Sequence, residues 1–108
     1  MNPLKDIPAL FKQAKEMQAK MAAIQQELAG KTVEVGTGGG MVKVSANGLG
    51  ELNSLSIDPE LINMKDREIL EDLILGAVNE AQRKANDLRQ EEMARLTGGL
   101  NIPGLFTP

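Results

Sequence analysis

Residues 7–29, IPALFKQAKEMQAKMAAIQQELA, carry the pattern that decides the fold, because their apolar side chains recur at alternating intervals of three and four residues. The members of this seam are Ile7, Leu10, Ala14, Met17, Met21, Ile24 and Leu28, with Phe11 widening it near the start. A period of 3.5 is typical of a helix that lays a narrow apolar seam against another helix. We expect Asp6 to cap this helix, Pro8 to lie in its first turn and Gly30 to end it.

The following stretch, residues 31–57, changes from this helical period to an alternation of apolar and polar residues. Strands are predicted at 32–35, 42–46 and 51–57. They are separated by a glycine-rich segment and by an Asn47-Gly48 turn, both typical of tight connections. Short connections favour an antiparallel three-stranded meander, and the apolar face of this sheet must be covered. That face carries Val33, Val35, Val42, Val44, Leu55 and Ile57.

The C-terminal half of the chain predicts a second long helix. Pro59 starts one short helical turn, and Asp66 then caps a helix over 67–96. The first half of this helix has an apolar stripe wide enough to cover a sheet. In the second half the stripe narrows, so this part either projects from the core or pairs with one more helix.

The chain is therefore predicted to form a single α+β domain over residues 1–108, with a three-stranded antiparallel sheet flanked by two long helices in the order α-β-β-β-α. Residues 1–6 and 98–108 are expected to be flexible ends. Aromatic residues make up only 2% of the chain, so its core must be built from smaller side chains. Since the seam of the first helix is also narrow, we expect two copies to share a core as a homodimer.

Composition argues against catalysis, because the chain has no histidine and no cysteine. The usual general base and the thiolate ligand are both missing, so we expect no enzyme, no metal site and no other cofactor. The acidic pairs Glu71-Asp72 and Glu91-Glu92 diverge on their helices and are expected to be solvated. No apolar run is long enough to span a membrane and no signal peptide is recognisable, which predicts a cytoplasmic protein.

The formal net charge is −3, which does not indicate a strongly basic nucleic-acid binder. Basic residues nevertheless outnumber acidic ones by five to three in residues 1–31 and by four to three in residues 83–108, whereas residues 59–82 have two basic and six acidic residues. The two basic segments could face DNA phosphates. Alternatively, four cations are paired on the surface with a glutamate four residues earlier: Glu16–Lys20, Glu27–Lys31, Glu80–Lys84 and Glu91–Arg95.

Several short motifs follow one another over residues 4–106: FKQAKEMQ at 11–18, GGGMVKV at 38–44, Asn47-Gly48, IDPEL at 57–61, LEDLI at 70–74, AVNEA at 77–81, Gly98-Gly99-Leu100 and Pro103-Gly104. In this order and spacing they make the chain resemble the YbaB/EbfC family of nucleoid-associated proteins. The resemblance implies an intertwined homodimer with projecting helices. It also implies association with DNA in the bacterial nucleoid and a role in nucleoid organisation or gene expression.

In that family, contact with DNA is assigned to the outer helices. Carried onto this sequence, the resemblance implies phosphate contacts from the basic residues of both long helices, which are Lys12, Lys15, Lys20, Arg83, Lys84, Arg89 and Arg95. The alternative is a non-enzymatic adaptor or scaffold dimer with little affinity for DNA, which would dock another protein through the seam of its first helix or through its C-terminal tail.

Overall fold

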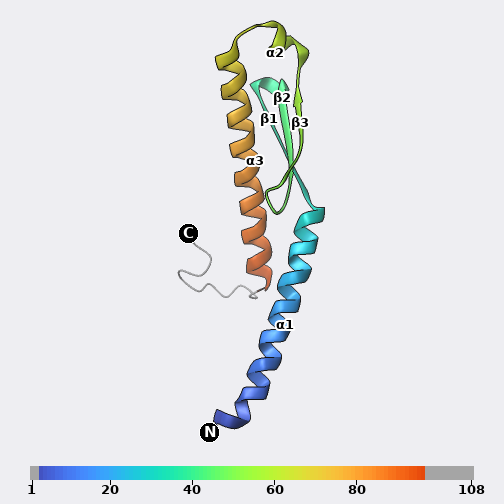
Figure 1. Cartoon of the computed structure of the whole chain (residues 1–108), viewed down its shortest axis with the longest axis vertical. Coiled ribbons are helices and arrows are strands. Elements are labelled where there is room, and N and C mark those ends of the chain that lie inside the picture. The colour runs from blue at the N-terminus through green and yellow to red at the C-terminus, as the bar shows by residue number, and fades with distance from the viewer. Residues whose placement is uncertain (1–2, 97–108) are drawn as a thin grey trace.

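The computed structural model describes residues 3–96, and the side chains of residues 6–96. The chain passes through α1 (Pro3–Gly30), β1 (Thr32–Thr37), a 3-10 turn η1 (Gly38–Gly40), β2 (Val42–Asn47), β3 (Leu52–Ile57), α2 (Pro59–Asn63) and α3 (Arg67–Leu96). The three strands form one antiparallel sheet in the order β1-β2-β3. The predicted α-β-β-β-α fold class is thereby confirmed (Figure 1).

The helix ends near the sheet follow from local sequence. Gly30 ends α1 as expected, and the bounds of α3 agree with the predicted 67–96. The Asp66 carboxylate accepts a hydrogen bond from the backbone N–H of Ile69 at 3.1 Å, which satisfies a free donor of the first turn of α3. Asp58 caps α2 in the same way, by accepting from the N–H of Glu60 at 2.9 Å.

The start of α1 differs from the prediction, because the helix begins at Pro3. Asp6 therefore lies in the first turn instead of capping the helix, and Pro8 lies inside the helix. Pro3 is suited to the first helical position, whereas Pro8 lies past the first turn and leaves one backbone oxygen of that turn without its usual donor. Of the expected flexible ends, residues 3–6 are helical, while residues 1–2 and 98–108 lie outside the described part of the chain.

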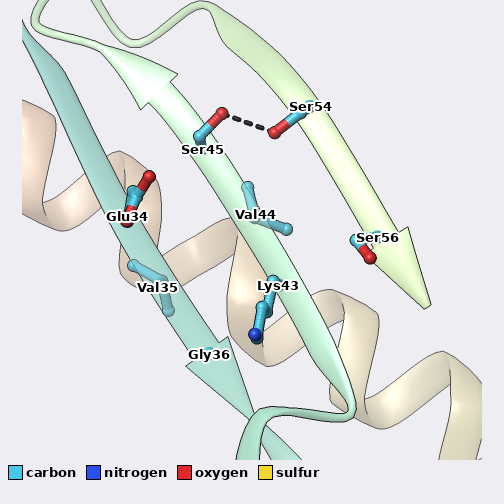
Figure 2. A pocket seen from close by; sticks show the side chains of 8 residues that line it. All are labelled: Glu34, Val35, Gly36, Lys43, Val44, Ser45, Ser54 and Ser56. Atoms are coloured by element: carbon cyan, nitrogen blue, oxygen red, sulfur yellow. Dashed lines mark hydrogen bonds between the residues drawn. The ribbon is translucent and has the colours of Figure 1, made fainter. Parts of the chain in front are cut away.

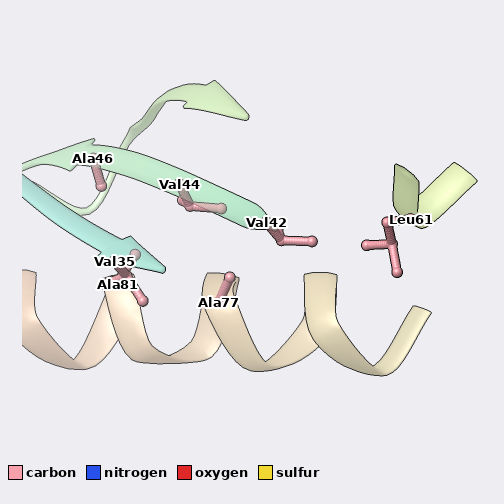
Figure 3. Packing of buried hydrophobic residues seen from close by; sticks show 7 residues of the cluster. All are labelled: Val35, Val42, Val44, Ala46, Leu61, Ala77 and Ala81. Carbon is pink, nitrogen blue, oxygen red and sulfur yellow. The ribbon is translucent and has the colours of Figure 1, made fainter. Parts of the chain in front are cut away.

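The core lies between the sheet and α3 (Figure 3). Val42 and Val44 of β2 are almost completely buried against Ala77 and Ala81 of α3, and Leu61 of α2 closes the end of this layer. The alanines let the helix approach the sheet closely, which suits a chain with so few large side chains. The buried core is therefore small, with one helix packed on one face of the sheet.

One expected core residue is not covered. Leu55 pairs with Val44 across β2 and β3 and so faces the same side of the sheet, yet it is 53% exposed. Leu52 on the same strand is also about half exposed. The physical reason is width: α3 packs against β1 and β2, and a single helix cannot also cover the third strand. The apolar face was expected to be covered, and within the described residues of this chain Leu55 is not.

The molecule is elongated, with extents of 73 × 25 × 18 Å. The C-terminal part of α1 lies beside the C-terminal part of α3, and the rest of α1 projects past the end of α3 (Figure 1). The narrow second half of α3 thus pairs with another helix of the same chain. We call residues 6–21 of α1 the α1 arm.

Candidate nucleic-acid interface

The predicted cations of α1 have no carboxylate partner among the described residues. Lys12, Lys15 and Lys20 are all exposed, and within residues 6–96 they form no ion pair. The expected pair between Glu16 and Lys20 is therefore not formed. Lys12 and Lys15 lie away from the seam, so an acidic partner surface approaching the arm from that side would meet both amino groups.

Two predicted cations of α3 are bound to carboxylates of the same helix. Arg83 pairs with Glu80 one turn before it and lies 3.9 Å from Asp87. The hydrogen bond from Arg83 lowers the pKa of Glu80, and Glu80 in turn raises the pKa of Arg83. Arg95 lies 3.9 Å from Glu91, which confirms that expected pair. The positive charge of both arginines is thus partly neutralised on the helix surface.

The two remaining predicted cations of α3, Lys84 and Arg89, contact the sheet and its turn. The amino group of Lys84 donates to the backbone oxygen of Glu34 on β1 at 3.2 Å. The guanidinium of Arg89 donates to the backbone oxygen of Gly48 in the β2–β3 turn at 3.4 Å. The expected ion pair between Lys84 and Glu80 is therefore not formed, although the side chain of Lys84 is exposed.

Glu92 departs most from expectation, because this carboxylate is only 3% exposed instead of solvated. The amino group of Lys31, just after α1, donates to its Oε1 at 2.7 Å, and Arg95 lies 3.3 Å from the same atom. The hydrogen bond from Lys31 lowers the pKa of Glu92, burial opposes this effect, and Arg95 adds to it. Lys31 is thus paired with Glu92 and not with Glu27, and it joins the two helices.

A shallow groove of 340 Å³ marks the place where α1 and α3 meet. It is lined by apolar and charged residues, which are Lys20, Ala23, Ile24, Glu27, Glu92, Arg95 and Leu96. Of the seven predicted cations, the groove brings together Lys20 and Arg95. Lys12 and Lys15 lie farther out on the α1 arm, Lys84 and Arg89 contact the sheet and its turn, and Arg83 is paired on α3. The predicted site is therefore spread along the length of the molecule.

The outer face of the sheet forms a second, polar concavity of 490 Å³ (Figure 2). Ser45 and Ser54 share a hydrogen bond of 2.6 Å across β2 and β3. Lys43 and Glu34 contribute one charge of each sign, so this face has hydrogen-bonding groups but no excess of positive charge. It is a weaker candidate for contact with a polyanion than the α1 arm.

Within residues 3–96, the helices include none that is long and apolar enough to cross a membrane. The described residues also contain no group of three or more acidic, histidine or cysteine side chains that could hold a metal ion.

Comparison with known proteins gives matches over nearly the whole chain. Residues 3–100 match the model of the YbaB/EbfC DNA-binding family. A nucleoid-associated protein of Thermoanaerobacter pseudethanolicus is 52% identical over 94% of this chain and 91% of its own length, and one of Desulfotalea psychrophila is 50% identical over 93% and 94%. The crystal structure of the uncharacterised protein HP0035 of Helicobacter pylori superposes with a TM-score of 0.76 at 28% identity, covering 82% of this chain and 94% of that one. The chain belongs to the YbaB/EbfC DNA-binding family.

Proposed function

We propose that this protein binds DNA in the bacterial nucleoid as a homodimer, and that the lysines of its α1 arms contact the phosphates. The observation that carries this proposal is the exposure of Lys12, Lys15 and Lys20 without intramolecular ion pairs among the described residues. A lysine that has no carboxylate partner can neutralise a DNA phosphate without first breaking an ion pair. The cation condensed on that phosphate is then released, which favours binding.

The acidic net charge does not oppose this assignment, because the acidic residues are concentrated elsewhere. Within the α1 arm three lysines face two acidic residues, Asp6 and Glu16. The acidic part of the chain is the start of α3, which lies at the opposite end of the molecule (Figure 1). Since charges farther apart than about 10 Å are screened at 0.1 M salt, a phosphate at the arm responds mainly to the arm's own lysines.

The names of the relatives support a nucleoid role, since those from T. pseudethanolicus and D. psychrophila are both called nucleoid-associated proteins. Contact with phosphates alone gives little sequence preference. A small dimer that binds many sites on the chromosome with modest affinity is compatible with that role. The proposal is therefore a binding function without catalysis.

The homodimer is supported by the uncovered strand. Leu52 and Leu55 of β3 are about half exposed, and α3 has an apolar hollow of 410 Å³ that is lined by Ile74, Leu75, Val78 and Glu71. We call the five apolar residues Leu52, Leu55, Ile74, Leu75 and Val78 the β3–α3 surface.

Hydrogen bonds show which side of α3 faces which strand. Thr37 of β1 donates to the backbone oxygen of Leu73 at 2.7 Å, whereas Gln82 donates to the oxygen of Gly50, just before β3, at 2.8 Å. Ile74 and Val78 lie on the same side of the helix as Gln82, four and eight residues before it. These residues of α3 are therefore on the side of the helix that is turned toward β3, and a second copy that covers Leu55 could cover them as well.

A DNA titration at several salt concentrations tests the proposal. If a dimer neutralises about six phosphates, the logarithm of its affinity should fall with the logarithm of salt concentration at a slope of roughly −5. A mobility shift or fluorescence anisotropy series between low and physiological salt measures this slope. A flat response would reject contact through phosphates, and the absence of binding at any salt would favour the adaptor alternative.

A further inference from the structure

The α1 arm has an apolar seam that no described residue covers. Leu10 is 60% exposed and Phe11 67% exposed, and Ile7, Met17 and Met21 are also exposed. Farther along α1 the same seam is packed, since Leu28 is 3% exposed and Ile24 lines the groove against α3. The seam thus continues from a helix–helix contact into solvent at the point where α3 ends.

We propose that the α1 arm pairs with the α1 arm of a second dimer, as a short antiparallel coiled coil. This inference takes the homodimer and the DNA contact of the proposed function as its setting. In coiled-coil terms the seam residues occupy the two core positions of the heptad. Phe11 and Gln18 flank the seam on one side, and Asp6, Gln13 and Lys20 flank it on the other.

The flanking residues select an antiparallel register. In an antiparallel pair, residues on the same flank of both helices face each other. A pair centred near Lys12 places Ile7 against Met17 of the second copy and Leu10 against its Ala14. In the same register the two Phe11 rings meet, the two Gln13 amides meet, and Asp6 meets Lys20 of the second copy twice by symmetry.

The charges of the arm are complementary in this register. Asp6 and Lys20 are both exposed, and among residues 6–96 neither belongs to an ion pair. A parallel pair would set Asp6 against Phe11 and Lys20 against Gln25, so neither charge would find an opposite partner. The antiparallel pair also leaves Lys12 and Lys15 on its outer sides, where they remain free for phosphates.

The length of the arm sets the strength of this pairing. Two heptads form a weak coiled coil by themselves, because short isolated helices are only marginally stable. Dimers held on one DNA molecule are at a high effective concentration, which strengthens a weak contact without any new interaction. Pairing of arms would therefore appear off DNA only at high protein concentration, and on DNA as cooperative binding.

Sedimentation of the full chain without DNA, up to hundreds of micromolar, tests the pairing directly. Wild-type protein should pass from dimer to tetramer. Lys20→Glu sets two carboxylates against each other at both ends and should weaken this step roughly tenfold. The double variant Asp6→Lys/Lys20→Glu exchanges the charges and should restore it. Leu10→Gln should remove the step, while Met64→Gln, an equally uncharged change at an exposed residue outside α1, should leave it intact.

The outcomes separate this inference from the proposed function. Tetramers that respond to Leu10→Gln in a protein that fails to bind DNA would support the pairing and reject the DNA proposal. Wild-type protein that stays dimeric, or a double variant no better than Lys20→Glu, would overturn the pairing. It would also be overturned if Leu10→Gln abolished the dimer itself, or if tetramers formed only after removal of residues 97–108, since another occupant would then cover the arm.

Discussion

Gly48 connects the sheet to the end of α1 through backbone hydrogen bonds. Its backbone N–H donates to the oxygens of Leu28 at 2.8 Å and Lys31 at 3.0 Å. A Cβ atom at this position would lie 2.7 Å from the backbone oxygen of Leu28 and 2.9 Å from its Cδ2 atom. Because the nearest neighbour is backbone, the clash cannot be relieved by rotating a side chain.

We expect Gly48→Ala to lower the free energy of unfolding by about 1–3 kcal/mol, as overpacking does elsewhere. Gly30→Ala is the matched control, since a Cβ there would have nothing within 4 Å. Thermal or urea unfolding of both variants measures the difference. Equal stability of the two would show that the turn and the end of α1 separate easily.

Glu92 makes the contact between α1 and α3 dependent on pH. The pKa of this carboxyl is lowered in the folded chain, chiefly by the hydrogen bond from Lys31, so its contribution is complete above the ordinary value for glutamate, about 4.3. That contribution is lost as the pH falls through the lowered pKa. Between roughly pH 5 and pH 3, we expect the free energy of unfolding to fall less in Glu92→Gln than in wild-type protein.

Thermal unfolding over this pH series provides the measurement, and Glu91→Gln is the control. Glu91 is an exposed neighbour whose distance to Arg95 is 3.9 Å, so its charge should matter little. If Glu92→Gln lost stability with acid as steeply as wild-type protein, other carboxylates would be responsible.

Single residues also mark the limit of what the sequence predicted. Glu92 was expected to be solvated, because a glutamate beside another glutamate on a helix is usually exposed. Its burial follows from the row Ala77, Ala81, Ala85 and Glu92, which are the buried residues of α3 and lie on one face. Lys31, its partner 61 residues earlier, could not be found from local spacing.

At the scale of the element, the α1 arm concentrates the proposed DNA contacts. We expect Lys12→Glu/Lys15→Glu to weaken DNA binding by at least about tenfold at low salt and to reduce the salt slope by about four, because each of two protomers loses two phosphate contacts. Anisotropy titrations at several salt concentrations give both values. The circular dichroism spectrum should not change, since both lysines are exposed and glutamate is a good helix former.

Lys65→Glu/Arg67→Glu is the matched control for this change. It alters the net charge by the same amount, but in the connection before α3 and at its first residue, where Arg67 already lies 3.3 Å from Glu71. Only a small effect on affinity is expected, through the overall charge. If both double variants lost the same affinity for DNA, the net charge of the protein would determine that affinity, and the α1 arm would not be the contact site.

Elements whose form depends on nearby residues were predicted well. The bounds of α3, the cap at Asp66 and the short helix after Asp58 all follow from local capping and periodicity. The glycines of η1 have φ values of 61°, 68° and 93°, which explains why this connection is so rich in glycine. By contrast, the exposure of Leu55 depends on where α3 lies across the sheet, and alternation along a strand does not contain that information.

At the scale of the whole molecule, two of the exposed apolar surfaces among the described residues lie far apart. The β3–α3 surface lies at the sheet, and the seam of the α1 arm lies at the projecting end (Figure 1). The sequence predicted a shared core between two copies and ascribed it to the seam of the first helix. The structure adds the β3–α3 surface, where apolar side chains from a strand and a helix combine into a wider contact area than one narrow seam offers.

The dimer proposed to form there can be tested by placing charges in it. Leu55 and Leu75 are 53% and 60% exposed, so Leu55→Glu and Leu75→Glu should hardly change the folded protomer. In a dimer each would bury a carboxylate without a partner and lose apolar contact, which should weaken association by about 3 kcal/mol, or roughly a hundredfold. Sedimentation at micromolar concentration should show a dimer for wild-type protein and for the control Met64→Glu, and a folded monomer for the two leucine variants. If wild-type protein were monomeric at this concentration, the proposed dimer would be rejected. If the two leucine variants remained dimeric, the interface would have to lie elsewhere than at β3.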